Sequence, residues 1–332
     1  MSGAGAKRPR VLSGMRPTGR LHLGNYLGAL QNWVSMQHQC ESFFMVADWH
    51  ALTTDHEHTD QIAPNTHEMV TDWLAAGIDP EKSPVFIQSR VKEHAELHLL
   101  FSMLVTVSRL ERNPTVKEQV RDLELEETIT YGLLGYPVLQ AADILLYRAT
   151  LVPVGEDQVP HVELTREIAR RFNALYGEVF PVPDPKLTHF PRLPGLDGRR
   201  MSKSLGNTIL LADSPQEIEA KVRTAFTDPK KLRKDDPGNP DGCVVFAYHR
   251  AFHPAGAAQI ERDCRAGAIG CVADKRELAG IVARSLEPIR DKRKELEAHP
   301  ERVREALRYG EEKARAMAVE TMRQVREAMK LG

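Results

Sequence analysis

The sequence has 332 residues, 42% hydrophobic and 27% charged, enough for one large hydrophobic core or two smaller ones, and we expect two domains. Because the formal net charge is −1, any nucleic acid must be bound through local basic patches and not through the overall field of the molecule. The four cysteines form no CxxC pair, and no segment approaches the roughly 20 apolar residues that cross a bilayer. We therefore expect a cytoplasmic protein with reduced thiols, no metal site, no membrane or DNA partner, and a loose tail over residues 1–10.

The first two thirds of the chain alternate between apolar runs and helical patterns. Residues 11–15, 42–48 and 84–88 have the composition of buried strands, and helices are expected from about Gly24 and over residues 62–76. This alternation predicts an α/β fold, a doubly wound parallel sheet over residues 11–205 with a helical insertion around 92–150. Ligands of such sheets bind beyond the carboxyl ends of the strands, which places the first candidate site directly after residue 15.

Strand signals fade after about Ala212. Residues 215–227, 273–298 and 301–329 have the charged, amphipathic pattern of helices, and residues 228–242 have the composition of a loop. The sequence therefore predicts a C-terminal α-helical domain over residues 206–332.

The first candidate motif, residues 16–26, leads from a strand into a helix. A helix N-terminus presents unpaired N–H groups and the positive end of a dipole, and Gly19 and Gly24 allow close approach of the backbone. His22 and Asn25 can donate hydrogen bonds to phosphate oxygens. Considered alone, an ordinary turn that contains glycine explains this segment equally well.

The second candidate motif, residues 197–207, is a basic loop of small residues near the start of the helical domain. Its cations are suited to follow charge that develops on a triphosphate. Considered alone, a solvated hinge loop explains a short stretch of lysine and serine better.

Together the two segments resemble the HIGH and KMSKS motifs of class I aminoacyl-tRNA synthetases, in the same order and at opposite ends of one α/β region. The first motif stands here as His22-Leu23-Gly24-Asn25 and the second as Arg200-Met201-Ser202-Lys203-Ser204, with arginine in place of the usual leading lysine. The resemblance implies a Rossmann-like catalytic domain and ATP-dependent attachment of an amino acid to tRNA.

Two segments in the middle of the chain, residues 136–147 and 152–158, resemble tryptophanyl-tRNA synthetases, and the likeness extends from residue 11 to the C-terminal helix. Tyr136, Gln140 and Asp143 follow the i, i+4, i+7 spacing and therefore share one face of a helix. Apolar neighbours make that helix mostly buried, so its polar residues need partners, and we expect a ligand to supply them.

The resemblance implies that Asp143 accepts a hydrogen bond from the indole N–H and that Tyr136 and Gln158 hold the α-ammonium group. A buried carboxylate left unpaired costs about 1–3 kcal/mol, so phenylalanine is rejected, whereas the hydroxyl of tyrosine must be excluded by the shape of the pocket. The expected tryptophan-binding residues are Leu12, Gly14, Tyr136, Gln140, Asp143, Val152, Val154 and Gln158.

The resemblance also implies an ATP site in which catalysis is mostly positioning and charge stabilisation, without an enzyme nucleophile. The expected catalytic residues are Thr18, His22, Asn25 and Lys203. Magnesium is expected to bind through the ATP phosphates, and Lys117 either reaches in from a mobile loop or is solvated. The expected ATP-binding residues are Arg16, Pro17, Thr18, Gly24, Asn25, Gly155, Glu156, Asp157, Leu193, Arg200, Met201, Ser202, Lys203 and Ser204.

Three of these positions depart from the usual family pattern. Leu12, Arg16 and Gln140 stand where phenylalanine, glutamine and methionine are common, so we expect an altered pocket and an added fixed charge near the substrate. Gln140 on this helix face also resembles tyrosyl-tRNA synthetases of the archaeal and eukaryotic type. The sequence therefore leaves open a tyrosine enzyme, a nucleotide-binding partner or regulatory protein, and a second tryptophan enzyme with altered indole tolerance.

For partners, the resemblance implies that the helical domain reads the tRNA anticodon and that two copies pair through the sheet domain. The basic clusters at residues 230–234 and 290–294 are either tRNA phosphate contacts or solvated faces. His94 and His98, four residues apart on an expected helix, lack the HExxH order of a metalloprotease and are interpreted as an ordinary helix face.

Overall fold

The computed structural model describes residues 8–122, 129–187 and 193–331, and residues 1–7 of the expected tail lie outside this part. A five-stranded, fully parallel sheet forms the centre, in the order β3-β2-β1-β4-β5. It confirms the predicted α/β class. The strands are β1 (Arg10–Met15), β2 (Glu41–Val46), β3 (Val85–Ile87), β4 (Leu151–Val154) and β5 (Asp184–Leu187).

Alternating side chains of the sheet enter two hydrophobic cores, one on each face, because successive residues of a strand point to opposite sides. On β2, Phe43 and Met45 enter the core shared with α8 and α9, whereas Phe44 and Val46 enter the core shared with α2 and α4. The helices around the sheet are α1 (Leu23–Asn25), the π-helical turn Tyr26–Leu30, α2 (Gln31–Met36), α3 (Asp48–Leu52), α4 (Ile62–Ala75), α5 (Glu93–Ser102), α6 (Val107–Glu111), α7 (Pro114–Asp122), α8 (Tyr131–Leu146) and α9 (Val159–Tyr176).

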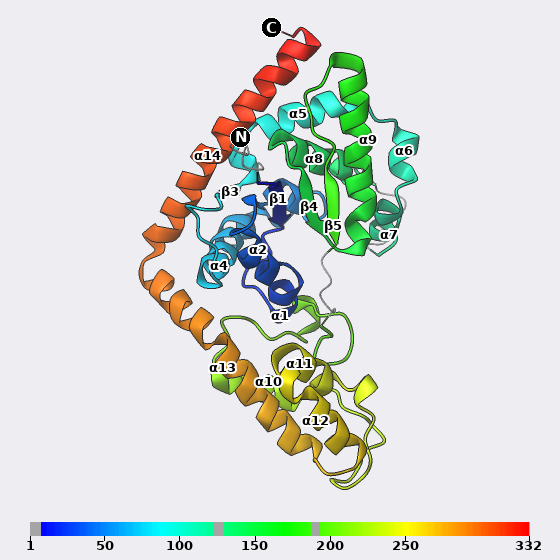
Figure 1. Ribbon diagram of the computed structural model, residues 1–332, viewed down its shortest axis with the longest axis vertical. Coiled ribbons are helices and arrows are strands. Elements are labelled where there is room, and N and C mark those ends of the chain that lie inside the picture. The colour runs from blue at the N-terminus through cyan, green and yellow to red at the C-terminus, as the bar shows by residue number, and fades with distance from the viewer. Residues whose placement is uncertain (1–7, 123–128, 188–192, 332) are drawn as a thin grey trace, which may run out of the picture.

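The remaining helices form a second layer below the sheet, and the last one returns to it (Figure 1). Helix α14 packs along β3 and α5, and Ala314, Ala318 and Met322 enter the core that α8 and α9 share. The C-terminal half of α14 belongs to the predicted helical domain but packs against the sheet domain. Contacts therefore cross the predicted boundary at residue 205. These helices are α10 (Pro215–Arg223), α11 (Val244–Phe252), α12 (Pro254–Arg265), α13 (Cys271–Ala298) and α14 (Pro300–Met329).

An ion-pair network joins the helical layer to the sheet layer. Arg293 of α13 is buried and pairs with Asp72 and Glu68 of α4. Asp72 also accepts the backbone N–H of Leu21 at 2.6 Å, so the chain just before the first motif is held by the same carboxylate. Burial raises the pKa of Asp72 while Arg293 lowers it. The network thus positions the first motif relative to α4 and α13.

The structure differs from the sequence-based elements at several points. Strands β4 and β5 were not expected, because Pro153 and Pro185 interrupt the strand signal and both strands have only four residues. Asp48 was expected to end a strand but begins α3. Helices α11 and α12 were not expected either. Within the described ranges, no helix is both long and apolar enough to cross a membrane.

Candidate active site

The expected site residues meet at the carboxyl edge of the sheet, beside β1 and β4. From β1 the chain continues to β2 and β3, which lie on one side of β1 within the sheet, and later to β4, which lies on the other side of β1. In parallel sheets, the crevice at the strand ends where the strand order reverses is the usual place for a ligand. Arg16 follows β1, His50 lies in the helix after β2, and Gly155 follows β4.

Gly14 keeps the surface of the central strand open. It is exposed although β1 lies between two other strands, and a Cβ atom there would stand 3.0 Å from the carbonyl oxygen of Met45. Strands β1 and β4 pair with Val11 opposite Leu151, so Leu12 and Gly14 share a face with Val152 and Val154. The structure therefore brings together four of the expected tryptophan-binding residues.

Asp143 on α8 is the charged centre of the site. Its Oδ1 accepts hydrogen bonds from Gln88 Nε2 at 2.8 Å and His94 Nδ1 at 2.6 Å, and its Oδ2 accepts one from His50 Nε2 at 2.8 Å. Burial opposes ionisation of Asp143, but the hydrogen bonds from the two histidines outweigh it and hold the pKa of the carboxyl below its usual value. Asp143 is therefore a buried carboxylate with three donors.

These contacts correct two expectations. Asp143 does not depend on a ligand for its partners, because protein side chains supply three, although a carboxylate has room for about four donors. His94 is not on an ordinary helix face: it is fully buried and its Nε2 lies 2.8 Å from the hydroxyl of Tyr147. Because Nδ1 of His94 donates to Asp143, Nε2 of the neutral ring is an acceptor, and the hydroxyl of Tyr147, whose pKa burial raises well above its usual value, donates a hydrogen bond to it.

His50 and Gln88 were missed by the sequence reasoning. Each lies just beyond the end of a strand, His50 after β2 and Gln88 after β3, and the position of polar residues there was the available signal. Gln140, by contrast, is half buried on α8 one turn before Asp143. Tyr136, Gln140 and Asp143 do lie on one helix, α8, as expected. The hydrogen-bond donors of Asp143, however, come from elements that are distant in the sequence.

Tyr136 has a protein partner of its own. Its hydroxyl lies 2.8 Å from Nε2 of His161 on α9, and Nδ1 of His161 lies 3.3 Å from the amide nitrogen of Asn113. His161 and Asn113 are both fully buried. Burial lowers the pKa of His161 to about 4, with a further decrease from His50, so the ring is neutral near pH 7.

Arg16 lies in the same region with one donor unused. Its terminal nitrogen Nη2 donates to the carbonyl of Ala51 at 3.3 Å and to the hydroxyl of Thr54, but its Nε is buried without a hydrogen-bond partner among the described residues. Burial lowers the pKa of Arg16, which is opposed by Asp55 and Tyr136. A half-buried guanidinium whose Nε–H has no partner among the described residues is suited to bind an anionic oxygen.

The first motif forms a tight helix start. His22 caps α1: its Nδ1 accepts the N–H of Asn25 at 3.3 Å, and Oδ1 of Asn25 accepts the N–H of His22 at 3.2 Å. Burial and the charge of Lys203 lower the pKa of His22 to about 4, so it is neutral near pH 7. Gly19 has a φ of +80°, which glycine adopts readily, and Thr18 before it is exposed.

The second motif folds against the first. The N–H of Gly24 lies 3.3 Å from the sulfur of the buried Met201, and the ammonium group of Lys203 donates to the carbonyl oxygen of Thr18. Burial lowers the pKa of Lys203, partly offset by Asp72. The structure thus places Lys203 next to the start of the first motif although they are far apart in sequence.

Asn207 fixes the shape of the second motif. Its Oδ1 accepts the N–H of Ser202 at 2.8 Å, and its Nδ2 donates to the carbonyl of Arg200 at 3.0 Å and to Asp197 at 2.8 Å. Arg200 is exposed at this surface, and Ser204 Oγ lies 2.8 Å from Ser202 Oγ. Leu193, which precedes this loop, packs against the core that contains residues of α2 and α4.

The segment after β4 forms the opposite wall of the crevice. Residues Glu156–Gln158 form a 3₁₀ turn, and the amide of Gln158 donates to Asp157 at 3.0 Å. Thr115 donates to the carbonyl of Asp157 at 3.0 Å and so joins this wall to the start of α7. Lys117 lies on α7, not in a loop as expected, and its side chain is exposed.

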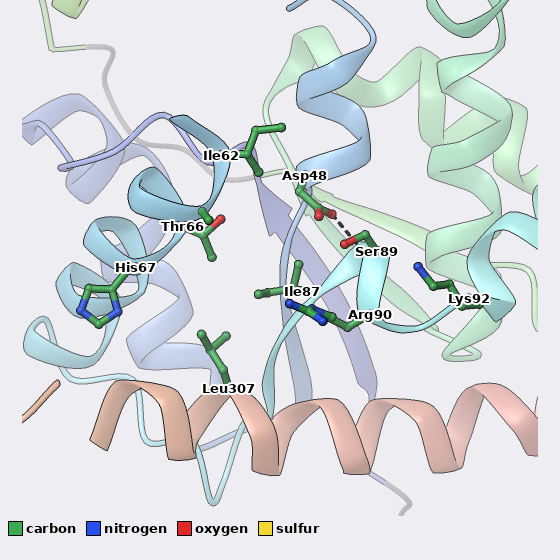
Figure 2. Close-up of a pocket in the computed structure, with 10 residues that line it drawn as sticks. Asp48, Ile62, Thr66, His67, Ile87, Ser89, Arg90, Lys92 and Leu307 are labelled. Carbon is green, nitrogen blue, oxygen red and sulfur yellow. Dashed lines mark hydrogen bonds between the residues drawn. The ribbon is translucent and has the colours of Figure 1, made fainter. Parts of the chain in front are cut away.

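A separate pocket of about 270 Å³ lies on the other side of β3, between α4, α14 and the turn Gln88–Arg90. Figure 2 shows Asp48 joined to Ser89, with Arg90 and Lys92 beside them; the N–H of Ser89 donates to Asp48 at 3.0 Å. None of the expected site residues lines this pocket. The described residues also contain no group of three or more histidine, cysteine or acidic side chains that could hold a metal.

Comparison with known proteins agrees with this geometry. The chain is 52% identical to the tryptophan–tRNA ligase of Thermotoga maritima, over 97% of this chain and 99% of that protein. It is 45% identical to the tryptophan–tRNA ligase of Aquifex aeolicus, over 97% and 100%. Among solved structures, tryptophanyl-tRNA synthetase of Campylobacter jejuni complexed with ADP and tryptophan matches with a TM-score of 0.86 at 34% identity, over 97% of this chain and 99% of that chain.

A family model described as class I tRNA synthetases for tryptophan and tyrosine matches residues 5–287. The resemblance seen in the two motifs and in the α8 segment is thereby confirmed. With this match and identities of 45% and 52% over nearly the whole length, the chain belongs to the class I aminoacyl-tRNA synthetase family that contains the tryptophan and tyrosine enzymes.

Proposed function

We propose that this protein is a tryptophan–tRNA ligase, which activates L-tryptophan with ATP, releases pyrophosphate and transfers the amino acid to tRNA. The observation that carries the proposal is Asp143, a buried carboxylate at the strand ends that retains room for a further donor. The relatives named above are tryptophan enzymes, which supports tryptophan over tyrosine.

In the proposed reaction, the tryptophan carboxylate attacks the α-phosphorus of ATP while the protein orients both substrates. Leu12, Val152 and Val154 line the ring pocket, and the ring N–H is the additional donor to Asp143. His22, Thr18 and Lys203 contact the phosphates, which fits their position where the two motifs meet. Charge that develops on the leaving pyrophosphate is stabilised by fixed cations and N–H groups.

The nucleotide lies across the crevice in this proposal. Gly24 and Asn25 approach it from α1, Gly155 and Asp157 hold its ribose from the end of β4, and Leu193 and Met201 contact its adenine side. Cations and amides dominate where the motifs meet, so the phosphate oxygens, rather than a cage of carboxylates, hold the Mg²⁺ that accompanies ATP.

The proposal is tested by exchange of pyrophosphate into ATP, measured with tryptophan and tyrosine in parallel. We expect exchange that depends on tryptophan and is at least about 100-fold slower with tyrosine, since loss of pocket fit and of donor geometry reduces kcat/KM. Exchange with tyrosine alone would overturn the amino-acid assignment. Absence of exchange with every amino acid would favour a nucleotide-binding partner or regulatory protein.

For tRNA, the helical layer is the proposed anticodon-binding part, but the two basic clusters contribute unequally. Lys231 is buried and donates to the carbonyl oxygens of Lys234 and Asp236. Arg290 and Arg293 are buried as well. Phosphate contacts in this proposal therefore come from the exposed members of the clusters, above all Lys230, Arg233, Lys234 and Lys294.

The proposed enzyme is a homodimer, and the supporting observation is apolar surface on α5 and its surroundings. Leu99 is 56% exposed, Met103 69% and Val107 59%, and Leu99 and Met103 lie one helical turn apart. Such side chains favour burial against a second copy. Changing Leu99 and Met103 together to aspartate is expected to convert a dimer to a monomer in sedimentation velocity; Val319→Asp, at an apolar residue that is 47% exposed on α14, serves as a control. A dimer that persists at low micromolar concentration would contradict this interface.

A further inference from the structure

The loop that leads into the first motif, residues 16–22, is held from one side by helix α4; we call it the motif loop. Glu68 and Asp72, the two α4 carboxylates, lie four residues apart and therefore share one face of the helix. Oε2 of Glu68 accepts a hydrogen bond from Nε of Arg20 at 2.7 Å, and Oδ2 of Asp72 accepts the backbone N–H of Leu21 at 2.6 Å. Both contacts come directly before the histidine of the first motif, so this face of α4 sets where the motif begins.

The motif loop is also where the second motif meets the first. Lys203 donates a hydrogen bond to the carbonyl oxygen of Thr18. At the next residue, Gly19, a Cβ atom would stand 2.7 Å from Oδ1 of Asn65 on α4 and 3.8 Å from Nζ of Lys203. The loop therefore lies in close contact with both α4 and Lys203, and a shift of the loop against α4 moves the carbonyl group that Lys203 contacts.

Arg293 reaches the same two carboxylates from the helical layer. Its side chain on α13 is only 3% exposed. Nη1 donates to Oδ1 of Asp72 at 2.5 Å and to the carbonyl oxygen of Glu68 at 3.3 Å, and Nη2 donates to Oε2 of Glu68. Each α4 carboxylate therefore joins a donor of Arg293 to a donor of the motif loop.

Removal of this guanidinium would change the hydrogen bond on the loop side of Asp72. Asp72 is fully buried and accepts hydrogen bonds from Arg293 and from the backbone of Leu21. A buried carboxylate that loses its cation is strongly unfavourable, so Asp72 must take up a proton or move toward water. A proton weakens Asp72 as an acceptor for the N–H of Leu21, and a movement displaces it.

We propose that Arg293 is a positioning residue for amino-acid activation, which acts through the α4 carboxylates to hold the motif loop against Lys203. This inference rests on the proposed function. The expected tryptophan-binding residues lie on β1, β4 and α8 and in the turn after β4, so a shift of the motif loop lowers kcat and leaves tryptophan affinity largely unchanged. A displacement of about 1 Å in a catalytic site can reduce the rate about 100-fold. The role also differs from the RNA contact considered for residues 290–294.

Replacing Arg293 by methionine tests the proposal. We expect kcat for tryptophan-dependent pyrophosphate exchange, counted per active site from the burst of ATP consumption, to fall roughly 10- to 100-fold. The dissociation constant for tryptophan, measured by calorimetry without ATP, should change less than about threefold. An unchanged kcat, or equal losses in kcat and in tryptophan affinity, would overturn the role.

A second variant carries the same test if the first does not fold. Arg293→Lys keeps a cation but lacks the planar fork that donates to both carboxylates. Its kcat should fall about three- to tenfold, again without a matching loss of tryptophan affinity. A wild-type kcat in Arg293→Lys together with an unfolded Arg293→Met would show that the cation serves stability alone.

Two other arginines of the helical layer provide matched controls. Arg290 is also buried on α13, but its Nη2 donates to the carbonyl oxygen of Ala283 within the same helix. Arg326 on α14 forms a two-pronged ion pair with Glu96 at 2.8 and 2.5 Å, which joins α14 to α5 at the other end of the molecule from α1 (Figure 1). Arg290→Met and Arg326→Met should each keep kcat within about threefold of the wild type. A loss in either control as large as that of Arg293→Met would assign the effect to packing of the two layers and overturn the proposal.

A double-mutant cycle with Lys203→Ala tests the route. If Arg293 acts by holding the motif loop against Lys203, the position of the loop matters less once that lysine is absent. Arg293→Met should then lower kcat by less than about threefold in the Lys203→Ala background. A further loss of the full size seen in the wild-type background would mean that the two residues act independently and would overturn the route.

Hydrogen exchange of the backbone provides a readout that does not need catalysis. The N–H of Leu21 is bonded to a buried carboxylate, so it should be protected from exchange in the wild type. A peptide that covers residues 19–25 should exchange faster in Arg293→Met than in the wild type and in Arg290→Met, whereas a peptide from α9 should not change. Unchanged protection of residues 19–25 in Arg293→Met would contradict the hold on the loop.

The outcomes of the two proposals remain distinguishable. If the wild type catalyses no tryptophan-dependent exchange of pyrophosphate, the proposed function fails, while faster hydrogen exchange of residues 19–25 in Arg293→Met is still expected. If the wild type is active but Arg293→Met keeps the wild-type kcat, the positioning role fails alone.

Discussion

Replacing Lys203 by alanine is expected to lower kcat for tryptophan-dependent pyrophosphate exchange by roughly 100- to 1000-fold, the usual effect of removing one preorganised donor from a transition state. The lysine lies where the second motif meets the first, donating to the carbonyl of Thr18. Its charge is suited to the pyrophosphate, which gains charge as the bond to the α-phosphorus breaks. The dissociation constant for tryptophan should change less than about threefold, because the amino acid contacts other elements.

Two variants isolate the role of this charge. Lys203→Arg keeps the cation with a different shape and is expected to retain more activity than Lys203→Ala. Arg199→Ala removes a cation from the same loop, where it pairs with Asp197 at 2.7 Å, and should leave kcat within about threefold. Equal losses in kcat and in tryptophan affinity for Lys203→Ala would mean that the lysine only supports the fold of the site.

The two motifs were predictable because their chemistry is local. His22 and Asn25 are three residues apart and cap each other, so their spacing alone contains the geometry. Asn207 holds the second motif from a position only five residues after Ser202. Such short-range relations are visible in the sequence itself. The residue periods that predict β1, β2 and α4 are visible there as well.

The surroundings of Asp143 were not predictable in the same way. Its donors His50, Gln88 and His94 come from three different elements and lie 93, 55 and 49 residues away in the chain. Only the parallel sheet, which gathers the carboxyl ends of β2 and β3 beside α8, brings them together. The sequence spacing of His94 and His98 indicated a helix face, but it contained no information about what that face packs against.

The charged clusters show the same limit for surfaces. Residues 230–234 and 290–294 look alike as runs of lysine and arginine. In the fold, Arg293 pairs with Asp72 and Glu68, more than 220 residues away, and has a structural role. Charge in a sequence therefore predicts a nucleic-acid contact only after the tertiary partners of each cation are known.

Replacing Asp143 by alanine is expected to remove the preference for a ring that carries an N–H donor. The comparison is between tryptophan and its benzothienyl analogue, in which sulfur replaces the indole N–H at nearly the same size. The wild type should favour tryptophan by roughly 10- to 100-fold in kcat/KM, the value of a hydrogen bond to a charged acceptor. In Asp143→Ala the two substrates should differ by less than about threefold, and tryptophan activity should fall roughly 100-fold or more.

Because the ratio is measured within one variant, it does not depend on how much of the protein is active. This matters because Asp143→Ala leaves the donors His50, Gln88 and His94 unpaired in a buried site, which costs stability. Asp143→Asn keeps an acceptor oxygen without the charge and should give an intermediate ratio, since a neutral acceptor forms a weaker hydrogen bond. Tyr147→Phe removes only the donor to His94 and should keep the wild-type ratio. A wild-type ratio in Asp143→Ala would show that another group accepts the ring N–H, and that Asp143 serves to hold the two histidines in place.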